Sequence, residues 1–193
     1  MTKTAAEFFI LESLDWDDEE HYREGKILSR TLRMSGKSPI YRYFRTRKEL
    51  KRLLHEFANS GYRYLHISCH GAPQGIHTTM DFISTDELCD MFGSILDRRR
   101  LFLSTCDATT RDLASRVFAT SACYSVCGPA REINFDDAVI LWTTLYHLLF
   151  KEDPDKINRE RLRRFLGNCA TLLDVQLRAY VRTGTGKAQL LRL

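Results

Sequence analysis

Short strand-like segments alternate with helix-like segments along this chain, and no other feature limits the possible folds as strongly. Five apolar runs predict strands at residues 8–14, 40–44, 62–69, 101–105 and 122–127. Segments with apolar residues at helical spacing separate and follow them. Because parallel neighbouring strands need crossover connections, which are usually helical, this order predicts an α/β fold with a mostly parallel central sheet flanked by helices.

Capping signals mark two of the predicted helices. Thr46 and Glu49 form a T-x-x-E capping box before a helix that stops at Gly61, and Ser84 with Glu87 opens a shorter helix. The helix predicted at residues 15–34 starts with several acids, which suits the positive end of a helix dipole. The Gly- and Pro-containing segment 71–83 predicts a loop or hairpin. The other predicted helices cover residues 15–34, 109–119, 138–149 and 162–177.

The length of 193 residues suits one domain, and the sequence contains no repeat, low-complexity tract or linker. We assign residues 1–182 to that domain and expect residues 183–193 to form a loose C-terminal tail. The net charge of +4 is small and spread among acids, so it does not indicate a nucleic-acid-binding surface.

The six cysteines fall mostly inside apolar runs, and no signal peptide is apparent. Both observations favour a reducing cytoplasm. The longest apolar run, AVILWTTLYHLLF, is too short to span a membrane and is predicted to be a core helix. Cys123 and Cys127 lie on one strand without a second pair, so we expect no zinc site.

Two predicted strands end on residues with catalytic chemistry. The run YLHISCHG ends on His70 and Gly71, and RLFLSTCDATT places Cys106 at the equivalent end of another strand. Ligands of open parallel sheets bind at the carboxyl ends of the strands, so neighbouring strands would bring an imidazole and a thiol together. Cys106 is then the nucleophile, His70 its base, and the N–H groups of Gly71 and Cys106 an oxyanion hole.

Side-chain alternation separates the other candidates on the same strand. Cys69 should point to the face opposite His70 and belong to the core, whereas His66 and Ser68 share the face of His70. For His66 we favour a hydrogen-bonded core histidine over a catalytic one.

These motifs carry a family resemblance. LHISCHG, LFLSTCDATT, ACYSVCGP and the later helix DDAVILWTTLYHLL resemble the CHAT family of caspase-related cysteine peptidases over roughly residues 62–150. The resemblance implies a three-layer caspase-like sandwich, with His70 as general base and Cys106 as nucleophile in peptide-bond hydrolysis. It implies no cofactor, a protein or peptide substrate, and control by a partner protein or by self-association in signalling or prokaryotic defence. The caspase context Q-A-C-[RQG]-G is absent, so a preference for acidic substrates is not implied.

Several acids near the predicted site are candidates for substrate binding. Asp107 follows the nucleophile, and Asp136 and Asp137 follow the fifth strand, with Asp81 and Glu132 as further possibilities. Any of them would suit a pocket for a basic side chain. Asp136 and Asp137 are equally suited to the start of the next helix, and the sequence does not choose between these roles.

Two other functions remain open from the sequence. One is a non-catalytic interaction module that keeps the caspase-like fold as a docking surface. The other is a nucleotide or phosphate binder on a flavodoxin-like sheet, which the absence of a G-x-G-x-x-G or P-loop motif disfavours. A phosphatase is disfavoured as well, because Cys106 and Arg111 are one residue too close for a phosphate loop.

Overall fold

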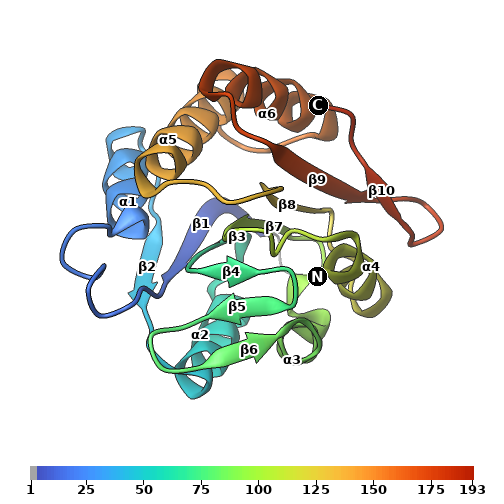
Figure 1. The fold of residues 1–193 in the computed structure, drawn as a ribbon. Coiled ribbons are helices and arrows are strands. Elements are labelled where there is room, and N and C mark those ends of the chain that lie inside the picture. The colour runs from blue at the N-terminus through green and yellow to red at the C-terminus, as the bar shows by residue number, and fades with distance from the viewer. Residues whose placement is uncertain (1–3) are drawn as a thin grey trace.

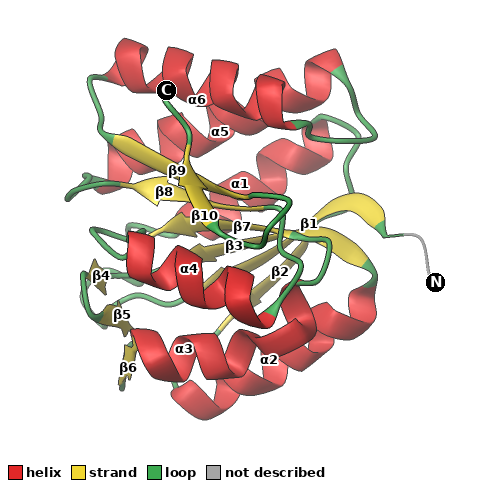
Figure 2. Cartoon of the chain, turned by 90° about the vertical axis from the view of Figure 1, so that its right-hand side faces the viewer, coloured by secondary structure: helices red, strands yellow, loops and turns green. Residues whose placement is uncertain are grey.

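The computed structural model describes residues 4–193, which form a helix–sheet–helix sandwich (Figures 1 and 2). Seven strands build the central sheet in the order β10-β9-β8-β7-β3-β1-β2, and three short strands build a second sheet in the order β4-β5-β6. Strands β2, β1, β3, β7 and β8 are parallel, whereas β9 and β10 are antiparallel to their neighbours. The predicted α/β sandwich with a mostly parallel central sheet is confirmed.

The elements have the following bounds. The strands of the central sheet are β1 (Ala5–Glu12), β2 (Ile40–Tyr43), β3 (Tyr62–Ser68), β7 (Arg100–Ser104), β8 (Ser125–Pro129), β9 (Leu177–Arg182) and β10 (Ala188–Leu190). The small sheet contains β4 (Gly71–Ala72), β5 (Gly75–His77) and β6 (Phe82–Ser84). The helices are α1 (Glu24–Met34), α2 (Arg47–Ser60), α3 (Thr85–Phe92), the 3-10 helix η1 (Gly93–Leu96), α4 (Arg111–Thr120), α5 (Phe135–Glu152) and α6 (Arg159–Leu173).

Helices cover both faces of the central sheet, so each central strand is apolar on both sides. Phe8 and Ile10 of β1 belong to the core under α1, α5 and α6, whereas Phe9 and Leu11 belong to the core under α2, α3 and α4. This split follows from the alternation of side chains along a strand. Figure 2 shows the two helical layers above and below the sheet, with the small sheet at one end.

Local signals positioned several elements correctly. Both capping boxes are present, at Thr46 with Glu49 and at Ser84 with Glu87. Gly61 ends α2 with a φ of 71°, in the left-handed region that favours glycine. The predicted core helix is α5, and no helix among residues 4–193 has the length and apolarity needed to cross a membrane.

The predicted helix over residues 15–34 is wrong in its first nine residues. Residues 16–21 form turns, and α1 begins only at Glu24. The acids of this segment bind side chains instead of a helix terminus: Glu19 pairs with Arg45, and Asp18 with His70. Tertiary ion pairs therefore replace the dipole interaction that the sequence suggested.

The C-terminal segment also differs from the expectation. Helix α6 ends at Leu173, and Leu177 begins a strand. Residues 188–190 of the expected loose tail pair with β9, and Leu191 is buried. The strand predicted at residues 122–127 is observed as β8, shifted towards the C-terminus. The domain boundary at residue 182 stays a prediction, although these strands tie the tail to the sheet.

Candidate active site

His70 and Cys106 follow two neighbouring strands of the sheet. β3 and β7 are parallel, and their last residues, Ser68 and Ser104, lie opposite each other in the register. The backbones of such neighbours are about 4.8 Å apart. Both candidate side chains therefore leave the same edge of the sheet, as the sequence predicted.

A cavity of about 170 Å³ lies at this edge, and both candidates line it. Its walls come from the ends of β3 and β7, the first residue of α1, and the β8–α5 loop with the first turns of α5. The lining residues are Glu24, Ser68, Cys69, His70, Ser104, Cys106, Glu132, Ile133, Asn134, Phe135 and Ala138.

Gly71 lies directly against the backbone of Cys106. A Cβ atom at this position would be 3.0 Å from the Cys106 nitrogen and 2.4 Å from its carbonyl oxygen. No side chain fits in that space, so glycine is required for β3 and β7 to end this close together. The approach is compatible with an oxyanion hole made by the two N–H groups, which stays a prediction.

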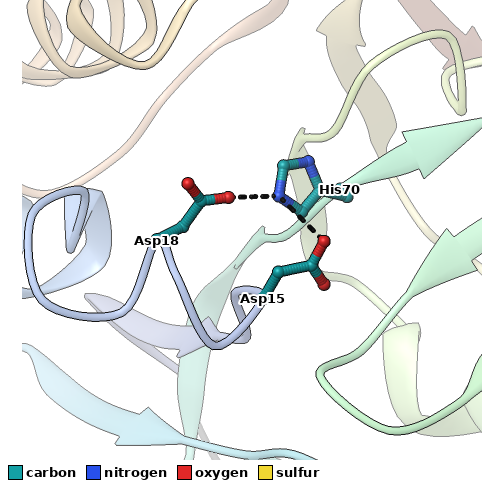
Figure 3. Close-up of side chains that lie close together, drawn as sticks. All are labelled: Asp15, Asp18 and His70. Atoms are coloured by element: carbon teal, nitrogen blue, oxygen red, sulfur yellow. Dashed lines mark hydrogen bonds and ion pairs between the residues drawn. The ribbon is translucent and has the colours of Figure 1, made fainter.

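Two carboxylates from the 15–22 segment contact the imidazole of His70 (Figure 3). The Nε2 atom is 2.9 Å from Asp18 Oδ2 and 3.8 Å from Asp15 Oδ2. A hydrogen bond from Nε2–H to Asp18 places the proton on Nε2 and leaves the lone pair on Nδ1. Nδ1 forms no hydrogen bond within residues 4–193 and is available to accept a proton.

The same three side chains also suit a divalent metal. One ligand atom from each of Asp15, Asp18 and His70 lies within 4.8 Å of the others. A zinc ion bound there would use the Nε2 atom and replace the Asp18 hydrogen bond. This grouping is not predicted from the sequence, where Asp15 and Asp18 are expected to lie in a helix.

The Cys106 thiol is half-buried and lies 3.9 Å from the carbonyl oxygen of Ile133. Burial raises the pKa of the Cys106 thiol, and the nearby charges of Glu132 and Asp107 raise it further. A raised pKa means that the thiol is protonated at neutral pH. Nucleophilic chemistry at Cys106 therefore needs a base in the same cavity.

Glu24 forms the polar floor of the cavity. It is 2% exposed, and its carboxylate accepts hydrogen bonds from His66 Nε2 at 3.1 Å, Ser68 Oγ at 3.1 Å and Ser104 Oγ at 2.8 Å. A carboxylate has about four lone-pair positions, so one remains available to a ligand. The location at the first residue of α1 also stabilises the negative charge.

A second buried carboxylate lies beside the first. Glu12 accepts hydrogen bonds from the Gly25 N–H and the Tyr41 hydroxyl, each at 2.6 Å. Burial raises the pKa of Glu12 to about 7, and the charge of Glu24 contributes in the same direction. The carboxyl end of the sheet thus concentrates acidic groups.

The structure separates the residues of β3 as alternation predicted. Cys69 packs into the core under α2, although it also lines part of the cavity, and burial raises its thiol pKa well above the usual range. His66 is fully buried, with its Nδ1 atom 2.7 Å from the Tyr146 hydroxyl and its Nε2 on Glu24. His66 is therefore a hydrogen-bonded core histidine.

The three acids predicted to bind substrate lie outside this cavity. Asp107 adopts a φ of 54° directly after Cys106. Asp136 and Asp137 belong to the first turn of α5, where the Asp136 carboxylate accepts the Asp137 N–H. That contact favours a role at the helix start. The acids that do line the cavity are Glu24 and Glu132.

Several solved structures of cysteine proteases share this arrangement of strands and helices. An inactive zymogen C11 protease from Parabacteroides distasonis aligns with a TM-score of 0.65 and 8% identity, covering 94% of this chain and 63% of that protease. The Arg-specific cysteine proteinase gingipain R aligns at 0.59 with 11% identity, covering 91% of this chain and 46% of that one. A secreted C11 cysteine protease from Bacteroides thetaiotaomicron aligns at 0.58 with 9% identity, covering 92% and 67%.

The chain has a caspase-like fold. The parallel order β8-β7-β3-β1-β2, with helices on both faces, carries this conclusion. The chain spans less than half of gingipain R and under two thirds of the Parabacteroides protease. No protein-family description matches the chain, and no curated protein matches it by sequence.

Proposed function

We propose that this caspase-like chain is a cysteine endopeptidase in which Cys106 is the nucleophile and His70 the general base. One observation carries the proposal: both side chains line a single cavity at the carboxyl edge of the sheet, although 36 positions separate them (106 − 70). The similarity to protease structures supports it. The resemblance to the CHAT family, drawn from the motifs around both residues, is part of the same proposal.

The mechanism begins with proton transfer. Asp18 holds the Nε2–H of His70, and the Nδ1 lone pair accepts the Cys106 proton when a substrate is bound. The thiolate attacks the scissile carbonyl carbon, and the N–H groups of Gly71 and Cys106 stabilise the oxyanion. The amine product leaves with the proton from His70. Water, deprotonated by His70, then hydrolyses the thioester and restores the thiol.

The cavity favours a basic side chain next to the cleaved bond. Glu24 provides a buried carboxylate at its floor, Glu132 a second carboxylate in its wall, and Ser68 and Ser104 provide hydroxyls. A bound guanidinium or ammonium group would neutralise Glu24, whereas an acidic side chain would place two negative charges together. The description of gingipain R as Arg-specific is consistent with this preference.

Control by a partner protein or by self-association remains part of the proposal, in signalling or prokaryotic defence. The raised pKa of the Cys106 thiol supports a resting state of low reactivity, which an activating contact would change. Among the similar structures, one is an inactive zymogen and another is a complex of pro- and mature domains of a Porphyromonas gingivalis protease.

A non-catalytic interaction module is the second candidate. The observation in its favour is the same protonated, half-buried thiol, because a docking surface does not require a reactive Cys106. The presence of an imidazole with a free Nδ1 atom in the same cavity favours the enzyme.

Peptidyl chloromethylketones distinguish the two candidates. We expect a reagent with arginine before the ketone to alkylate Cys106 faster than the five other cysteines, as located by mass spectrometry of digested protein. The labelling should be lost in His70→Ala and kept in His77→Ala, a matched control at an exposed histidine of β5. Equal labelling of Cys106 in all three proteins would favour the interaction module.

A further inference from the structure

A second cavity lies at the opposite edge of the sheet, where the parallel strands begin. It has a volume of about 330 Å³ and is lined by four basic side chains, Arg63, Arg98, Arg100 and Lys156, together with Tyr124. Arg63 is the second residue of β3, Arg100 opens β7, and Lys156 lies in the loop between α5 and α6. Among residues 4–193, no acidic side chain lines this cavity.

The guanidinium of Arg100 is buried against neutral partners. Its Nε and Nη2 atoms donate to the Ile157 carbonyl at 3.2 and 2.7 Å, and Nη1 donates to Ser125 Oγ at 2.9 Å. The residue is 7% exposed, and burial lowers its pKa. Charge taken out of water without a counterion is unfavourable, so the protein holds positive charge here that its own acids do not neutralise.

Arg63 repeats this arrangement on the neighbouring strand. It donates from Nε to Thr4 Oγ1 at 3.1 Å, from Nη1 to the Asp155 carbonyl at 3.0 Å and from Nη2 to the Thr4 carbonyl at 2.6 Å. A guanidinium has five N–H donors, so two remain after these bonds. Within residues 4–193, no carboxylate forms an ion pair with Arg63, Arg100 or Lys156.

These bonds by themselves have a structural role, because both arginines hold the 153–158 loop against the ends of the strands. That role explains the carbonyl contacts but not the gathering of four cations around one concavity. Like charges held close together by the fold repel one another, and a bound anion removes the repulsion. Planar guanidinium groups with unused N–H donors match phosphate oxygens.

We propose that this cavity binds a polyphosphate chain, either inorganic or carried by a nucleotide. The charges of Arg63, Arg100 and Lys156 match a triphosphate better than a single monoanion. The half-exposed ring of Tyr124, which lies 5.4 Å from the Arg100 guanidinium, provides a stacking surface for a nucleotide base at the rim. The site is independent of the proposed peptidase function, since roughly 23 Å of strand separates Arg63 from His70 at about 3.3 Å per residue.

Titration calorimetry of the full chain with inorganic triphosphate at low salt tests the proposal. We expect one binding site, an affinity that falls steeply with salt, and a loss of about tenfold in Lys156→Gln. Lys156 is exposed, so this variant preserves the fold. Arg63→Lys keeps the charge but removes the planar donors, and it should weaken binding by a similar factor. Lys26→Gln, an exposed lysine of α1 with the same change in charge, is the matched control and should bind as the wild type does.

A parallel titration with ATP distinguishes the two sources of the phosphate chain. Tighter binding of ATP than of triphosphate, with the difference removed by Tyr124→Leu, assigns a nucleotide. Equal affinities for ATP and inorganic triphosphate would mean that the cavity recognises only the phosphate chain. The proposal is overturned if wild-type protein shows neither binding heat nor thermal stabilisation at millimolar triphosphate, or if all variants including Lys26→Gln bind equally, since binding would then reflect net charge only.

Discussion

The two ends of the same parallel strands carry opposite charge. At the carboxyl ends of β1, β3 and β7, Glu12 and Glu24 are buried and Asp18 contacts His70. At the amino ends of β3 and β7, Arg63 and Arg100 line a cavity that has no acidic side chain from residues 4–193. The hydrophobic core lies between the two ends, so the two groups of charged side chains are kept apart.

The comparison shows how charge separates on this fold. The net charge of +4 does not reveal either charged region, because acidic and basic residues nearly balance over the whole chain. The helix dipole favours negative charge at the acidic end, because α1 begins there and its positive N-terminus lies at Glu24. Four experiments test the chemistry assigned to the acidic end.

The largest effect is expected from removal of the proposed nucleophile or base. Cys106→Ala and His70→Ala should each lower kcat/KM for a peptide substrate by about a thousandfold or more, since no other group replaces either role. Steady-state cleavage of fluorogenic peptides measures this. His77→Ala should retain activity, and activity that survives in Cys106→Ala would move the chemistry to another part of the molecule.

The next effect concerns stability at the acidic end. Glu12 is protonated in the folded protein up to a pKa of about 7, against an ordinary value of 4.5. Stability from this group is complete below pH 4.5 and is lost as the pH rises to 7, which amounts to about 3 kcal/mol. Urea unfolding of wild type and Glu12→Gln across this range should show that the variant lacks this decline.

Glu20→Gln is the matched control, because Glu20 is exposed in the neighbouring segment 15–22. Its pH dependence of unfolding should follow that of the wild type. A Glu12→Gln variant with an unchanged decline would mean that another group titrates.

A selectivity measurement tests the floor of the acidic cavity. In Glu24→Gln, kcat/KM for a peptide with arginine before the cut should fall about a hundredfold, whereas the value for the neutral isostere citrulline should change little. The ratio of the two kcat/KM values is independent of the fraction of folded enzyme, because both substrates are cleaved by the same sample. Glu20→Gln again serves as the control, and an unchanged ratio in Glu24→Gln would exclude Glu24 from substrate recognition.

The smallest effect is expected at the residue that positions the base. Asp18→Asn should lower kcat about tenfold with little change in KM, because His70 loses its preferred orientation but keeps its Nδ1 lone pair. Asp18→Glu should restore part of the rate. Asp17→Asn, an exposed neighbour, is the control. A change in KM alone would assign Asp18 to substrate binding.

Periodic and local signals in the sequence predicted most of the fold. Capping boxes and apolar alternation identified α2, α3 and the parallel strands, because these depend on residues close in sequence. The sequence did not predict β9 and β10 because these strands depend on non-local pairing, of β9 with β8 and of β10 with β9, which no local pattern reveals.

The candidate site divides in the same way. His70, Gly71 and Cys106 could be proposed from the sequence because each follows an apolar strand, whereas the proposed role of Glu24 depends on where α1 begins. The one sequence cue to this helix start was the glycine at position 25. In the structure, a Cβ atom on Gly25 would lie 3.0 Å from Ile10 and 3.2 Å from Glu12, so the start of α1 packs tightly against β1. The contact of Asp18 with His70 required the path of the 15–22 segment, which tertiary ion pairs determine.

The late position of Glu132 along the chain has a consequence for synthesis. The cavity takes its parts from α1, β3, β7 and the residues that follow β8, so a nascent polypeptide lacks one wall until residues 132–138 have left the ribosome. A growing chain therefore exposes His70 and Cys106 without a closed pocket around them. The complete cavity therefore forms only after the start of α5 has been synthesised.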